Sequence, residues 1–274
     1  VRAQDATTPW FLYYSTGCSH APHQVPTEWS DKYKGKFDSG WDAYREKTLE
    51  RQKRLGVVPE DTELSERPDL FPAWDTLGDD EKKLYARQME VFAGYSENAD
   101  WNVGRLLDAV EEMGELDNTI VVYIWGDNGS SAEGQRGTIS ELLAQNSIPT
   151  TIDDHLRTLD ELGGLEVLGT AKTDNMYHAG WAWAGSSPYK STKLIGAHFG
   201  GTRQPMAVAW PAKLKQDDTP RPQFHHVIDI APTLYEILDI TPPRTVNGIP
   251  QDSIDGTSML YTFDDPEAEG RRTT

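Results

Sequence analysis

An acid and an amide stand side by side directly after a predicted buried strand. Asp127 and Asn128 follow the β-branched and aromatic run 119–125, and glycine and serine follow them. Because open α/β sheets bind their ligands at the carboxyl ends of strands, this position favours a binding site. Two adjacent hard oxygen ligands favour a divalent cation such as calcium or magnesium. Asp-Asn-Gly is also ordinary turn chemistry, so the pair alone leaves both interpretations open.

Further ionisable side chains lie in loops after predicted strands or beside glycine turns. They are His20, His23, Lys193, His198 and Arg203. The first two follow the apolar run 10–15, which we expect to be a buried strand, and the others surround the double glycine 200–201. A cation with nearby lysine and histidine could bind an anionic ester, neutralise its charge and protonate the leaving oxygen. This set predicts a hydrolase of phosphate or sulfate esters.

The elements that must position these groups alternate in type. Apolar residues recur every three or four positions from 79 to 113, which predicts a long amphipathic helix ended by Gly114. The strand 119–125 follows, and this helix-to-strand crossover predicts an α/β fold with a mostly parallel sheet sandwiched by helices.

The other segments have weaker patterns. We expect two short helices around Pro149, a helix at 224–238 in which His225 and His226 serve as a cap and a core contact, and another apolar run at 206–210. The Trp- and Gly-rich stretch 176–188, with His178, is expected to be a loop. We expect residues 27–78 to form an irregular excursion with short helices bordering the site, and 264–274 to be a loose tail.

Composition disfavours two classes of partner. The formal net charge of -18 disfavours nucleic acid and anionic membranes, because a phosphate backbone requires clustered Lys and Arg. No stretch approaches the ~20 apolar residues of a membrane span, so we expect a soluble protein, either cytoplasmic or periplasmic.

The single cysteine, Cys18, excludes an internal disulfide and a Cys-based zinc cluster, and we expect it to be a small buried residue.

Taken together, the motifs make the sequence closely similar to the sulfatase family of the alkaline-phosphatase-like superfamily, and specifically to bacterial arylsulfatases. The motifs are His20-Ala21-Pro22-His23 up to Pro26, Lys32–Phe37 with Gly40-Trp41-Asp42, Gly126-Asp127-Asn128-Gly129 with Ala132-Glu133-Gly134, Thr192-Lys193 with His198–Arg203, and His226–Thr233. The resemblance covers nearly the whole chain, 1–274, which we expect to form one domain.

The resemblance assigns roles to individual residues. It implies that Asp127 and Asn128 supply half of a calcium site, and that Lys193 and His20 bind the oxygens of a small-molecule sulfate ester. His20 matches because it stands in a His-x-Pro-x-x-x-Pro frame, and the family histidine also helps to protonate the leaving alcohol.

The neighbouring groups are weaker candidates. His198 could bind substrate or only pack beneath the glycine turn. His23 is expected to be a loop histidine bonded to backbone, and Arg203 is expected to make a structural ion pair.

The resemblance also implies parts that this sequence lacks. Sulfatases have a paired aspartate and a Cys-x-Pro-x-Arg motif whose cysteine becomes formylglycine, the nucleophile, and Cys18 fails that spacing. A small C-terminal antiparallel subdomain is lacking too. We therefore expect a chain truncated at both ends, without a nucleophile, that does not hydrolyse aryl sulfates alone. Apolar surface left by missing strands could drive self-association.

Two alternatives stay open. One is a phosphonate monoester or phosphodiester hydrolase of the same superfamily, and the other is a non-catalytic remnant that keeps the sulfatase scaffold. The presence of His20, Asp127, Asn128 and Lys193 together favours an enzyme, because drift has no reason to spare four polar groups at once.

Overall fold

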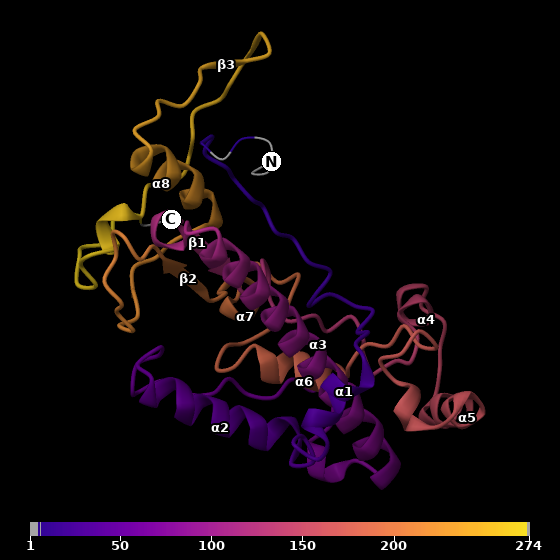
Figure 1. Ribbon diagram of the computed structural model, residues 1–274. Coiled ribbons are helices and arrows are strands. Elements are labelled where there is room, and N and C mark those ends of the chain that lie inside the picture. Colours follow the sequence, from indigo (N-terminus) through magenta and orange to yellow (C-terminus); the bar gives the residue numbers. More distant parts are fainter. Residues whose placement is uncertain (1–4, 6, 273–274) are drawn as a thin grey trace.

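The computed structural model describes residue 5 and residues 7–272, and helices dominate it (Figure 1). The helices are α1 (Thr27–Ser30), α2 (Gly40–Arg54), α3 (Asp79–Glu112), α4 (Glu141–Gln145), α5 (Ile152–Leu162), α6 (Ala179–Gly185), α7 (Phe199–Thr202) and α8 (Ile230–Ile237). Short 3₁₀ helices cover Asp31–Tyr33, Trp74–Thr76, Leu116–Asn118, Leu165–Val167, Val227–Asp229 and Leu260–Thr262. The strands are β1 (Val121–Ile124), β2 (Met206–Ala209), β3 (Thr245–Val246) and β4 (Ile249–Pro250).

Helix α3 is the longest element and confirms the predicted helix 79–113. The Glu81 carboxylate accepts the Gly78 backbone N–H at 2.9 Å, and the three acidic residues of the first turn interact favourably with the helix dipole. Gly114 follows the helix with a φ of +72°, a conformation that glycine adopts easily. The half of α3 nearer its N-terminus is buried around Leu84 and Val91, so it anchors the core.

The predicted strand 119–125 is confirmed as β1, but the expected mostly parallel sheet is not seen in the described residues. β1 pairs antiparallel with β2, from Val121 opposite Ala209 to Ile124 opposite Met206, and β3 pairs antiparallel with β4. In residues 7–272, parallel pairing is limited to one isolated bridge between Ser140 and Asp174.

Two other predictions from sequence are wrong. The run 10–15 is not a buried strand: it has no strand partner within the described chain, and Phe11 and Tyr13 are 78% and 82% exposed. The stretch 176–188 is not a loop, because it contains the buried helix α6. His178 starts α6 by accepting the Gly180 N–H on its Nδ1 at 2.9 Å.

The core is an aromatic cluster between α2, the buried half of α3, and α6 (Figure 1). Trp41 is fully buried, stacks on His178 with ring centroids 4.6 Å apart, and meets the edge of Trp74 at 4.8 Å. Gly180 allows this approach, since a Cβ there would lie 2.5 Å from the Trp41 ring. The 15-residue helix α2 is therefore a core element, although we expected only short helices in 27–78.

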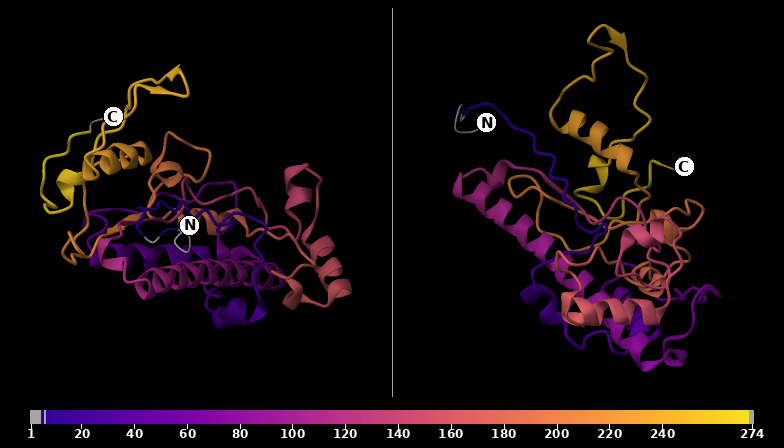
Figure 2. Two further views of the ribbon diagram at one scale, coloured as in Figure 1. Left: turned by 45° about the horizontal axis from the view of Figure 1, so that its top comes forward. Right: turned by 90° about the vertical axis from the view of Figure 1, so that its right-hand side faces the viewer.

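Two peripheral parts project from this core (Figure 2). The helices α4 and α5 confirm the two short helices expected around Pro149, and the hairpin β3–β4 extends elsewhere beyond α8. Among the helices of residues 7–272, none combines the length and apolar sequence needed to cross a membrane.

The helix expected at 224–238 begins only at Ile230. The Nδ1 atom of His226 accepts the Ile228 N–H at 3.3 Å ahead of it, which agrees with the predicted cap. The segment expected to be a loose tail makes specific contacts instead. Gln223 Nε2 donates to the carbonyls of Pro266 and Ala268, and Arg272 pairs with buried Asp229.

Candidate active site

The structure brings His20 and Lys193 together, although 173 positions separate them. Lys193 Nζ lies 3.3 Å from His20 Nε2. The other ring nitrogen, Nδ1, lies 2.8 Å from the carbonyl oxygen of Ala21, which can only accept a hydrogen bond. These partners assign the proton of the neutral ring to Nδ1, so Nε2 accepts a hydrogen bond from the Lys193 ammonium.

Glu133 completes this cluster, and sequence reasoning did not select it. Its Oε2 atom accepts hydrogen bonds from Lys193 Nζ at 2.8 Å and from Ser131 Oγ at 2.6 Å. The bonds from Lys193 and Ser131 hold the pKa of the Glu133 carboxyl below its usual range, so it is ionised at neutral pH. The only available sequence feature was its place in the Ala132-Glu133-Gly134 motif.

Two loops position Lys193 by direct backbone contact. The Lys193 N–H donates to the carbonyl of Ser130 at 3.0 Å, and the Gly129 N–H donates to the carbonyl of Gly201 at 3.0 Å. Gly129 is buried where the loops cross. The loop that follows β1 is thereby fixed against the loop that presents the lysine.

Gly129→Ala should disturb this crossing. A Cβ at position 129 would meet the Gly200 carbonyl oxygen and lie 2.7 Å from the Lys193 nitrogen. We expect a loss of about 1–3 kcal/mol in the free energy of unfolding, because backbone atoms cannot move aside cheaply. Urea unfolding followed by far-UV circular dichroism measures this.

Gly196→Ala is the matched control. It lies in the same lysine loop, but its Cβ would meet nothing within 4 Å. Equal unfolding free energies for the two variants would contradict the proposed close crossing.

Asp127 and Asn128 lie exposed on the loop that leads to Gly129, three and four residues beyond the end of β1. Their hard oxygen donors suit calcium, which takes about six to eight oxygen ligands. Within residues 7–272 no group of three or more His, Cys, Asp or Glu side chains could hold a metal ion. The pair therefore fits part of a cation shell and does not complete it.

Comparison with known proteins identifies the family of this chain. A model of the sulfatase family matches residues 1–240. The chain belongs to the sulfatase family. The family implies an alkaline-phosphatase-like α/β fold and, in general, hydrolysis of sulfuric esters through a divalent metal and formylglycine. The resemblance inferred from the sequence motifs is confirmed.

This sulfatase chain is similar to parts of two longer curated proteins. It is 31% identical over 244 residues to an uncharacterized sulfatase of Schizosaccharomyces pombe, covering 89% of this chain and 42% of the relative. It is 25% identical over 260 residues to an arylsulfatase of Klebsiella aerogenes, covering 94% of this chain and 52% of the relative. The chain thus spans about half the length of these relatives, and a bacterial origin stays a prediction.

The other candidate residues of the sulfatase chain lie around the cluster. His23 is buried, with its ring centroid 5.0 Å from those of Phe92 and Tyr177, and burial lowers its pKa to about 3. Its backbone N–H bonds to the carbonyl of Asn175, and its Nδ1 atom has no hydrogen-bond partner among the described residues. His23 is therefore a neutral ring packed among aromatic side chains.

His198 and Arg203 flank helix α7. His198 is half-buried immediately before α7, and its side chain makes no capping bond there. The ion pair expected for Arg203 is not found among the described residues; its guanidinium lies over the ring of Tyr189, 5.3 Å from the centroid.

Cys18 differs slightly from the expected buried residue. It is half-buried, and burial raises the pKa of its thiol to about 11. This thiol stays protonated at neutral pH, which makes it a poor nucleophile.

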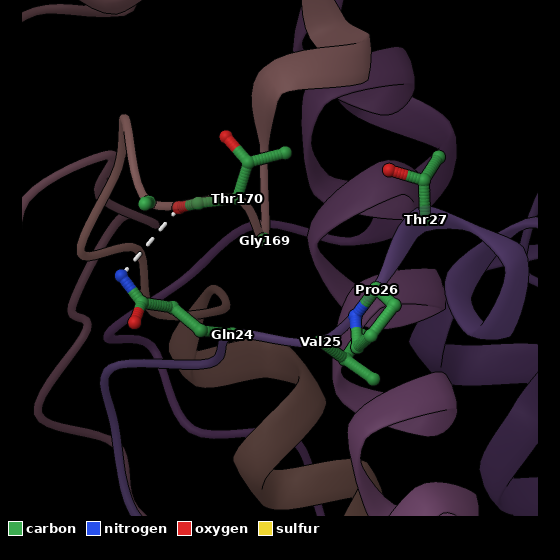
Figure 3. Close-up of a pocket in the computed structure, with 7 residues that line it drawn as sticks. Gln24, Val25, Pro26, Thr27, Gly169 and Thr170 are labelled. Carbon is green, nitrogen blue, oxygen red and sulfur yellow. Dashed lines mark hydrogen bonds between the residues drawn. The ribbon is translucent and has the colours of Figure 1, made fainter.

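A separate cavity follows the histidine loop (Figure 3). It has a volume of about 340 Å³ and is lined by Gln24–Thr27 and Gly169–Ala171. Its lining residues carry no charged side chain, and none of the clustered residues lines it. The candidate active site of this sulfatase chain is therefore the partly exposed His20–Lys193–Glu133 cluster and not this cavity.

Proposed function

We propose that this chain supplies the sulfate-binding part of an arylsulfatase, which converts a sulfate ester and water into an alcohol and sulfate. The observation that carries the proposal is the contact between the Lys193 ammonium and the His20 imidazole. The same ammonium also donates a hydrogen bond to the Glu133 carboxylate. A cation beside a ring that can move a proton suits an anionic ester whose leaving group must be protonated.

Each of these side chains has a distinct role in the proposed site. The Lys193 ammonium has three donors; among the described residues two point at Glu133 and His20, which leaves one for a sulfate oxygen. His20 Nε2 can take up a proton and deliver it to the leaving alkoxide. When Nε2 is protonated, the nearby Glu133 carboxylate offsets the repulsion between the imidazolium and the ammonium.

The remaining parts of the proposed site involve groups that are not in this structure. Asp127 and Asn128 would supply some of the ligands of a calcium ion. When bound, this ion neutralises charge on the ester. Cys18 does not match the motif of the formylglycine precursor, so we place the nucleophile outside this chain and expect no turnover from the chain alone. The mostly parallel sheet of the family also remains an expectation.

Substitution of Lys193 tests the proposal. Lys193→Gln should weaken binding of phenyl sulfate about tenfold or more, because a hydrogen bond to a charged group contributes about 1.5–3 kcal/mol. Binding is measured by NMR titration of the isotope-labelled chain, which also shows that the variant stays folded.

Lys190→Gln removes the same charge from an exposed lysine three positions earlier in the same loop. It should bind phenyl sulfate almost as well as the unchanged chain. The proposal fails if the two substitutions weaken binding equally, or if the unchanged chain does not bind phenyl sulfate.

A further inference from the structure

The proposed anion site contains a carboxylate that sulfate binding does not require. Glu133 Oε2 lies 2.8 Å from Lys193 Nζ, the atom that would receive the substrate. Both side chains are partly exposed, at 15% for Lys193 and 35% for Glu133. An ionised carboxylate beside an anion site weakens the binding of any anion, so its presence calls for a physical role.

The charges of the cluster nearly cancel. Lys193 contributes one positive charge, Glu133 contributes one negative charge, and His20 is neutral when its Nε2 accepts from Lys193. The carboxylate is also held in place by Ser131, which donates to the same oxygen at 2.6 Å. Glu133 therefore cannot easily turn away when an anion arrives.

Repulsion from a fixed carboxylate depends on the charge of the ligand. A sulfate monoester carries one negative charge, whereas a phosphate monoester carries nearly two above its second pKa of about 6. An anion bound to another N–H of Lys193 would lie roughly 4.5 Å from the Glu133 oxygen, since two hydrogen bonds would then share one tetrahedral nitrogen. A dianion there experiences about twice the repulsion that a monoanion does.

We propose that Glu133 is a specificity-determining residue that makes the Lys193–His20 site select monoanionic esters over dianionic ones. This inference rests on the proposed function, because it requires that an ester bind at Lys193. It narrows the substrate class to esters with a single charge on the transferred group and disfavours phosphate monoesters. Phosphate diesters and phosphonate monoesters, which are also monoanions, remain acceptable to such a site.

The test compares two ligands of the same shape and different charge. Phenyl sulfate and phenyl phosphate are titrated into the chain at about pH 8, where the phosphate ester is a dianion. The buffer contains little salt, so that screening is weak, and a chelator, so that metal is equally absent from every sample. The measured quantity is the ratio of the Kd values for the two ligands.

Glu133→Gln removes the charge and keeps an oxygen that can accept from Lys193 and Ser131. We expect this variant to change the Kd ratio by about tenfold in favour of phenyl phosphate, from one unit of extra charge repulsion at this distance. Ser131→Ala is the matched control, because it removes the bond of Ser131 to the carboxylate without changing any charge. Lys193 still holds the carboxylate at 2.8 Å in this variant, so the ratio should change much less than in Glu133→Gln.

The outcomes separate this inference from the proposed function. An unchanged Kd ratio in Glu133→Gln, with phenyl sulfate still bound, overturns the role of Glu133 and leaves the anion site standing. A ratio that changes equally in Ser131→Ala also overturns it, since loss of the Glu133 charge would then have no effect beyond loss of the Ser131 bond. Failure of the unchanged chain to bind phenyl sulfate overturns both proposals.

Discussion

Trp41→Ala is expected to lower the free energy of unfolding by about 3–5 kcal/mol, because it leaves a large cavity in the centre of the core. The Trp41 side chain is fully buried and contacts rings from three other elements, among them Trp74 and Trp181. Its ring also stacks on His178, whose side chain begins helix α6. Urea unfolding followed by far-UV circular dichroism measures the loss.

Two variants serve as controls for Trp41→Ala. Trp41→Phe keeps an aromatic ring and should lower the free energy of unfolding less than Trp41→Ala does, since a smaller cavity remains. Trp101→Ala removes a tryptophan that is 51% exposed on α3 and should change the unfolding free energy much less. If Trp41→Ala proved no more costly than Trp101→Ala, the cluster around Trp41 would not be the centre of the core.

Asp229→Ala is expected to lower the free energy of unfolding by a similar amount, about 3–5 kcal/mol. The reason is that it leaves the Arg272 guanidinium without its buried partner. The Asp229 side chain is 1% exposed and lies 2.8 Å from Arg272. It also accepts the backbone N–H groups of His226 and Thr257 at 2.8 Å each. Removing it should release both the start of α8 and the C-terminal segment.

Asp217→Ala is the control for this pair. Asp217 forms an exposed ion pair with Arg221 in the same part of the chain. The unfolding midpoint should hardly change, because solvent screens the exposed pair. Equal midpoints for Asp229→Ala and Asp217→Ala would show that Asp229 does not hold the tail.

The Asp229 carboxylate should also make stability depend on pH. Burial raises its pKa, but hydrogen bonds from Thr257 and His226 and the charge of Arg272 outweigh this and hold the folded-state pKa below its usual value. Since the unfolded pKa is about 3.9, this stabilisation is present above about pH 4 and disappears as pH falls through the folded-state pKa. Asp229→Asn does not titrate, so its deficit in unfolding free energy relative to the unchanged chain should stay constant above about pH 4 and shrink as pH falls below it.

Local patterns in the sequence predicted several elements correctly. The period of three to four apolar residues located α3 within a residue at its end, and the β-branched run located β1. The same reasoning failed at 10–15 and 176–188. The first run lies exposed without a strand partner among the described residues, and the second forms a helix buried against Trp41. Apolar character alone does not say which partner a segment will find.

The sequence by itself determined the family and the residue types of the candidate site. Asp127, Asn128, His20 and Lys193 stand in motifs whose residue types and spacing can be compared directly along the chain. Their roles in binding metal and ester stay predictions.

Only the tertiary structure decided which of these groups meet. Lys193 contacts His20 across 173 positions and Glu133 across 60, because glycines at crossing points let two loops approach within hydrogen-bond distance. No local pattern encodes such a meeting, since it depends on how separate loops pack. For that reason the carboxylate of Glu133, and the charge selectivity that we propose for it, emerged from the structure and not from the sequence.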